Sequence, residues 1–236
     1  MLHFDKLPPN PDATTLLALL APSEFLDFHH PAVAGFIATS GAQRGSEIER
    51  AVALFYAARD RIRYDPYQIS ALPQAYRASS VIEAGHGWCV PKASLLAASA
   101  RAVGIPAAIG LADVANHLNT EKLRARMGGT DIFYDHGYVA LYLGGRWVKA
   151  VPAFNIELCQ RFGVSPTEFD GTSDALYQEY NARGERHMQY LSDHGCWSDL
   201  PLTKVLEDFA RHYPGNLFTT RRETSSPRFE DERPLN

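Results

Sequence analysis

The stretch from Ala84 to Pro106, AGHGWCVPKASLLAASARAVGIP, decides the fold. Cys89 stands where a glycine-rich loop gives way to a helix, since Pro91 suits a first helical turn. Apolar residues then recur at helical spacing until Gly104 ends the helix and Pro106 opens the next segment. This pattern predicts a buried helix with a cysteine in its first turn.

The position of Cys89 also predicts its chemistry. A thiol in a first helical turn lies beside unpaired backbone N–H groups and the positive end of the helix dipole. Both stabilise the thiolate, so we expect the pKa of Cys89 to be lowered and its sulfur to be nucleophilic. The alternative is that Cys89 is a small apolar core residue, the usual state of a free cysteine.

Composition limits the other functional classes. The chain has 236 residues, of which 45% are hydrophobic and 21% charged, as in an ordinary soluble globular protein. A net charge of −4 provides no basic field, so we expect no nucleic-acid partner. Three scattered cysteines form no disulfide framework, and neither a signal peptide nor a membrane span is evident. We expect a cytoplasmic protein that contacts no membrane and uses no cofactor or metal; the sequence carries no signal for its oligomeric state.

Two further elements are well marked in the sequence. A helix is predicted over residues 46–62, because Ser46 and Glu49 have the spacing of a capping box before an amphipathic run. The clearest strand signal is a pair of apolar segments joined by Gly144–Gly145, a dipeptide suited to a tight hairpin. His136 stands at the start of the first of these strands, on the side opposite the purely aliphatic residues.

The remaining segments are less distinctive. Residues 107–114 are expected to form a strand, residues 174–194 an aromatic-rich helical region, and residues 203–212 a last helix. The residues from 219 to the end lack the apolar content to pack and are expected to be mobile. Tyr64, in the turn before the cysteine loop, is interpreted as a packing residue.

The order of these parts resembles the transglutaminase-like superfamily. Its core has Gly-x-Cys-x-x-x-Ala at the helix, then Gly-Ile-Pro-Ala, a His at a strand start, and Trp-x-x-x-Asp-Pro on the next strand. The resemblance implies an α+β fold with a papain-like core, in which the cysteine helix packs on an antiparallel sheet and extra helices lie at both ends. It covers roughly residues 46–155, and the matching positions are Gly87, Cys89, Ala93, Gly104 to Ala107, His136, Trp147 and Pro152.

The resemblance also suggests how the chain is divided. We expect an N-terminal helical arm over residues 1–45 and a catalytic core over residues 46–155. A helical extension of the same domain would follow over residues 156–218, and the mobile tail over residues 219–236.

By the same resemblance, Cys89 would form an acyl-enzyme while His136 holds the thiolate and then protonates the leaving group. Val151 stands where the family motif has the Asp that orients this histidine. Asn155, four residues further on, is the candidate replacement, since an Asn has this role in papain-like sites. The alternative is that Asn155 caps a helix beginning at Ile156.

These residues indicate cysteine-dependent acyl transfer from an amide, ester or thioester. Hydrolysis is favoured over amide formation because water is always present, and the substrate is expected to be small or peptide-like. Trp88, Asn116 and His117 are the candidate substrate-binding residues, and residues 116–130 and 165–200 the candidate pocket walls. The Cys89 N–H is the expected first oxyanion donor, with Trp88 or an upstream side chain as the second.

Two other classes of function stay open. A catalytically silent binding domain of the same fold would account for the missing Asp. A zinc hydrolase could use His86, Cys89 and His136, with His117 as a further ligand, although the first two straddle a helix start.

Overall fold

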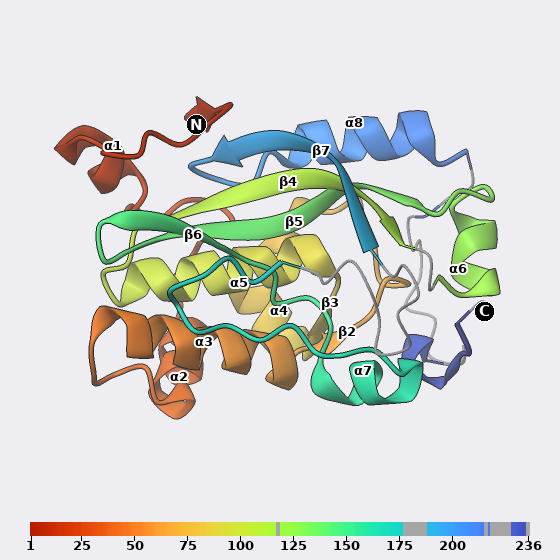
Figure 1. Cartoon of the computed structure of the whole chain (residues 1–236), viewed down its shortest axis with the longest axis horizontal. Helices are drawn as coiled ribbons and strands as arrows, with labels where there is room; N and C mark the ends of the chain where they lie inside the picture. The colour runs from red at the N-terminus through yellow and green to blue at the C-terminus, as the bar shows by residue number, and fades with distance from the viewer. Residues whose placement is uncertain (117–118, 177–187, 215–216, 218–227, 235–236) are drawn as a thin grey trace.

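A five-stranded sheet organises the molecule, with strand order β1-β7-β4-β5-β6 (Figure 1). All of its pairings are antiparallel. The computed structural model describes residues 1–116, 119–176, 188–214, 217 and 228–234. In chain order the strands of the sheet are β1 (His3–Phe4), β4 (Ala107–Asn116), β5 (Ile132–Leu143), β6 (Arg146–Ala150) and β7 (Met188–Trp197).

Helix α5 (Cys89–Ala102) packs against one face of this sheet and is buried over nearly its whole length. The sheet covers one side of α5, while α3 (Glu47–Arg61) and α4 (Ala78–Ala84) cover the other. A helix enclosed in this way has few exposed positions, which explains the many small and aliphatic residues after Cys89. The predicted α+β architecture, with the cysteine helix on an antiparallel sheet, is confirmed.

Local sequence signals fix the neighbours of α5 as well. Helix α3 begins with the predicted capping box, in which Ser46 and Glu49 bond each other's backbone N–H groups. Strands β5 and β6 form the predicted hairpin, and both Gly144 and Gly145 have the positive φ angles that its turn requires.

Strand β7 corrects one prediction. Residues 174–194 were expected to be helical, but residues 188–197 form a strand that pairs with β4 inside the sheet. Pairing with a neighbouring strand outweighs local preference here, and two register shifts let β7 follow β4 without a regular alternation. Residues 177–187 of that segment lie outside the described residues.

The other elements surround this core, and none of the helices in the described part of the chain is long and apolar enough to cross a bilayer. At the C-terminal end, α8 (Leu202–His212) lies near the start of β5 (Figure 1). The smaller elements are α1 (Ala13–Ala18), α2 (Pro31–Ser40), β2 (Arg63–Tyr64), a 3-10 helix (Pro73–Tyr76), β3 (His86–Gly87), α6 (Glu121–Arg126), α7 (Ile156–Phe162) and a second 3-10 helix (Phe229–Asp231).

Most of the expected mobile tail, residues 219–227 and 235–236, lies outside the described residues. Residues 228–234 are placed, and Phe229 is buried against Phe162 of α7. The division into an arm, a core, an extension and a tail stays a prediction.

Candidate active site

Cys89 is the first residue of α5, and its side chain is buried. The backbone N–H groups of Gly137, Val90 and Cys89 itself lie close to the sulfur and favour its thiolate, which lowers the pKa of the thiol. Two of these donors are N–H groups that the start of a helix leaves unpaired, and the third comes from the neighbouring strand β5. The thiol therefore sits where a helix start and a strand present donors to one atom.

Burial outweighs these donors in setting the acidity of the thiol. Removal from water raises the pKa of Cys89 to about 12, although the three N–H groups lower it. The lowered pKa expected from the helix start is therefore wrong for this closed site. The helix start does favour the thiolate, but less than the surrounding apolar side chains oppose it.

We expect the rate of Cys89 alkylation by iodoacetamide to keep rising beyond about pH 9, because the thiolate is scarce below the raised pKa. The rate should be measured between about pH 6 and pH 10. A Cys89→Ala variant supplies the background from Cys159 and Cys196, whose pKa values burial raises to about 11. An inflection below about pH 7.5, as activated cysteines show, would contradict this expectation.

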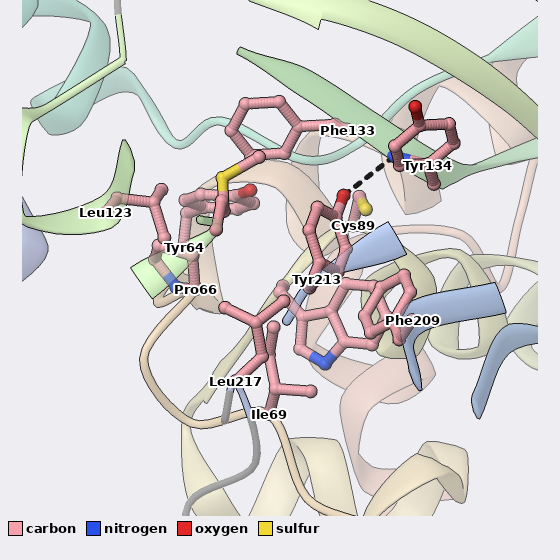
Figure 2. A pocket seen from close by; sticks show the side chains of 12 residues that line it. Tyr64, Pro66, Ile69, Cys89, Leu123, Phe133, Tyr134, Phe209, Tyr213 and Leu217 are labelled. Atoms are coloured by element: carbon pink, nitrogen blue, oxygen red, sulfur yellow. Dashed lines mark hydrogen bonds between the residues drawn. The ribbon is translucent and has the colours of Figure 1, made fainter. Parts of the chain in front are cut away.

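The thiol borders an apolar pocket (Figure 2). Its free volume is about 20 Å³, room for little more than one water molecule. Aromatic rings make up half of the wall, so the space beside the thiol is small and mostly apolar. The lining residues are Tyr64, Pro66, Ile69, Trp88, Cys89, Leu123, Met127, Phe133, Tyr134, Phe209, Tyr213 and Leu217.

The walls of the pocket agree only in part with the predicted ones. Leu123 and Met127 come from the expected region 116–130, but the described part of the opposite wall comes from α8 and the residues after it. None of the described residues of 165–200 lines the pocket. Tyr213 closes this side, since its hydroxyl accepts from the Tyr134 N–H at 2.8 Å and donates to the Ile132 carbonyl at 3.0 Å. These bonds tie the C-terminal wall to the start of β5.

His136 lies in β5 and is buried, but it is not among the residues that line the pocket beside the thiol. The pairing of β4 with β5 is regular from His136 to Tyr138, so these two side chains share a sheet face. Gly137 points to the other face, where an added Cβ would lie 2.9 Å from the Val90 Cα. Gly137, and not the His136 side chain, is therefore directed at Cys89.

Burial lowers the pKa of His136 to about 3, so its imidazole is neutral near pH 7. With the thiol protonated and the imidazole neutral, the closed site holds no thiolate–imidazolium pair. The role of His136 as the base stays a prediction.

Asn155 has different partners from those expected. It occupies the N-cap position of α7, which begins at Ile156 as the capping alternative predicted, but its side chain makes no capping bond. Its Oδ1 accepts from the Tyr64 N–H at 3.0 Å, and its Nδ2 donates to Glu157 at 2.8 Å. Asn155 thus fixes the backbone of a pocket residue, and its predicted role in orienting His136 stays untested.

The three candidate substrate-binding residues do not lie together at the pocket. Trp88 lines the pocket, and its ring lies 5.4 Å from that of Phe209. Asn116 is buried at the end of β4, where its N–H donates to the Asp131 carbonyl, and it is not a lining residue. His117 lies outside the described residues.

Sequence reasoning missed a polar cluster on the Cys89 side of the sheet. Oxygen atoms of Asp113 and Asp135 and a nitrogen of His194 lie within 4.8 Å of one another. Asp135 is buried with a left-handed φ of 52°, and the negative charge of its carboxylate raises the pKa of Cys89. Lys204 donates to Asp135 at 2.5 Å and to Asp208 at 2.8 Å. The left-handed residue and the strand irregularity that bring these groups together leave no mark in the sequence.

This cluster bears on the zinc hydrolase alternative. Among the described residues, the group arranged to hold a cation is Asp113, Asp135 and His194. It includes none of the proposed ligands His86, Cys89 and His136. The Lys204 ammonium group already neutralises part of the charge of this cluster, so the arrangement does not support a zinc hydrolase.

Comparison with known proteins identifies the family of the chain. The family model of the transglutaminase-like superfamily matches residues 36–152, a span that contains Cys89 and His136. The chain belongs to the transglutaminase-like superfamily, as the sequence predicted. At the level of the superfamily, this supports a cysteine-based hydrolase or transferase.

Among solved structures, the chain is similar to "a Putative Cysteine Protease from Cytophaga hutchinsonii", with 17% identity and a TM-score of 0.48. The alignment covers 84% of this chain and 52% of that one, so the chain spans about half the length of that protein. No curated protein matches the sequence.

Proposed function

We propose that the protein is a cysteine-dependent acyl-transfer enzyme in which Cys89 attacks the carbonyl of an amide, ester or thioester. The observation that carries this proposal is the convergence of the Gly137, Val90 and Cys89 N–H groups on the sulfur. Attack at a carbonyl creates an oxyanion close to the attacking atom, and fixed donors at that place stabilise it. A helix start and a paired strand hold these donors without any motion of side chains.

In the proposed reaction the sulfur forms a bond to the acyl carbon, and the leaving group departs with a proton. Water then attacks the thioester and releases the acid, which makes hydrolysis the favoured outcome over amide formation. The substrate is small or peptide-like, and the three unpaired cysteines support a reducing, cytoplasmic location.

A base must take the thiol proton, and His136 is the predicted one. Because its side chain lies on the other sheet face, this role requires the start of β5 to rearrange when substrate enters. Tyr213 bonds the backbone at Ile132 and Tyr134, so its release would free that part of the strand.

A catalytically silent binding domain is the second candidate function. It is favoured by the raised pKa of Cys89, by the direction of His136, and by Val151 in place of the motif Asp. Under this alternative the pocket would bind an apolar group without forming a covalent bond to it.

Hydrolysis of a panel of p-nitrophenyl esters and acyl thioesters separates the two functions. We expect the parent protein to turn over at least one ester, and a Cys89→Ala variant to lose that activity to background. A Cys159→Ala variant is the matched control, because Cys159 is equally buried but lies in α7. Turnover that persists without Cys89 would contradict the proposal.

A further inference from the structure

Tyr64 enters the Cys89 pocket from β2, a two-residue strand. Strand β2 pairs in parallel with β3, and the register sets Tyr64 opposite Gly87, two residues before Cys89. Figure 2 shows the Tyr64 ring across the pocket from Cys89, with its hydroxyl directed into the pocket. A phenol from an earlier part of the chain is thereby brought to the nucleophile.

The position of this phenol is fixed by packing and by hydrogen bonds. The Tyr64 side chain is buried, and its ring packs edge to face on Phe154 at 4.8 Å and on Phe229 at 5.8 Å. The Tyr64 N–H donates to the Asn155 side chain at 3.0 Å. A donor held in this way loses little conformational entropy when it forms a hydrogen bond to a reacting group.

The hydroxyl of Tyr64 differs from those of Tyr76 and Tyr213, the other buried tyrosines near the thiol. The Tyr76 hydroxyl donates to the Ser70 carbonyl at 2.7 Å, and the Tyr213 hydroxyl to the Ile132 carbonyl at 3.0 Å. Within the part of the chain that the structure describes, no group accepts from the Tyr64 hydroxyl. A buried hydroxyl that faces a pocket without an acceptor is available to a ligand.

The Tyr64 hydroxyl also remains protonated across the neutral range. Burial raises the pKa of Tyr64 well above its usual range, and the neighbouring Cys89 thiolate raises it further. The phenol is therefore a neutral donor and cannot act as a base near neutral pH.

We propose that the Tyr64 hydroxyl donates a hydrogen bond to the oxyanion that forms when Cys89 attacks the acyl carbonyl. This inference rests on the proposed acyl-transfer function and adds a side-chain donor to the backbone N–H groups near the sulfur. As the sulfur–carbon bond forms, the carbonyl π electrons move to the oxygen that Tyr64 contacts. When the oxyanion collapses, the bond to the leaving group breaks and that group takes up the proton lost by the thiol.

The test compares two reactions of the same sulfur in a Tyr64→Phe variant, which keeps the ring and removes only the hydroxyl. Acylation by a p-nitrophenyl ester passes through an oxyanion, whereas alkylation by iodoacetamide displaces iodide at a saturated carbon and does not. We expect acylation of Cys89 to slow by about 100-fold, the usual effect of losing one oxyanion donor. Alkylation should proceed at the rate of the parent protein.

Tyr76→Phe is the matched control, since Tyr76 is also buried beside Trp88 but already donates to a carbonyl. We expect it to change neither rate. Equal acylation of the parent and Tyr64→Phe would overturn the role of Tyr64 while leaving the proposed function in place. A similar fall in the acylation and alkylation rates would also overturn the role of Tyr64. The hydroxyl would then affect the reactivity of the thiol or the packing of the pocket, and not the oxyanion. If the parent is alkylated but never acylated, the proposed function fails, and the role of Tyr64 fails with it.

Discussion

Replacement of Gly137 by alanine is expected to lower the free energy of unfolding by about 2 kcal/mol, the usual cost of an overpacked contact. An added Cβ would lie 2.9 Å from the Val90 Cα and 3.2 Å from the Cys89 carbonyl oxygen. Both are backbone atoms, so neither can turn aside as a side chain would. Strand β5 and the start of α5 must therefore move apart, which takes the Gly137 N–H further from the sulfur.

Urea unfolding monitored by circular dichroism measures this loss. Gly35→Ala is the matched control, because Gly35 lies inside α2 and an added Cβ meets nothing within 4 Å. That variant should be more stable than the parent by up to about 1 kcal/mol, since alanine favours a helix interior over glycine. Equal stability of the two variants would show that β5 and α5 do not touch at Gly137.

Acid is expected to destabilise the parent protein more than a His136→Gln variant. Burial lowers the pKa of His136 to about 3, whereas an unfolded histidine titrates near 6.5. Between these two values the unfolded chain binds the proton and the folded chain does not, so stability falls as the pH falls below about 6.5. This contribution should amount to about 2 kcal/mol between about pH 7.5 and pH 5.

The measurement is the free energy of unfolding of both proteins at several pH values in that window. The substitution has its own cost at every pH, so only the difference in slope between the two curves is relevant. Parallel curves would mean that His136 is protonated in the folded protein at pH 5, and that its ring is not held in a dry environment.

Where local signals are strong, the sequence predicts the fold well. The glycines before Cys89, Pro91 and the apolar run after it place the start of α5 correctly. The capping box of α3 and the glycine pair between β5 and β6 are likewise local, since each depends only on residues a few positions apart. The family resemblance joined these pieces into one architecture.

The chemistry of the site depends on contacts that no local pattern contains. The pKa of Cys89 is raised because α6, α8 and the start of β5 close around it, and Phe209 lies 120 positions along the chain. Strand β7 forms because β4 offers it a partner, which its own residues do not indicate. The raised pKa and this strand are therefore two of the features that the sequence alone did not predict.

His136 shows a limit of a different kind. Alternation along its strand already separated it from the aliphatic residues that face the core. Cys89 belongs to the helix that packs against these aliphatic residues. The alternation therefore places His136 on the sheet face away from that helix, whereas the family resemblance places it beside the thiol. The register of β4 and β5 agrees with the alternation.

The central claim is that Cys89 accepts an acyl group, and peptide mapping by mass spectrometry tests it most directly. The protein is treated with an acyl thioester, quenched in acid and digested, and the peptide that contains Cys89 is weighed. We expect this peptide to gain the mass of the acyl group, and the Cys89→Ala protein to gain none. If iodoacetamide labels Cys89 under the same conditions but no acyl donor does, the acyl-transfer account is contradicted and the silent binding domain takes its place.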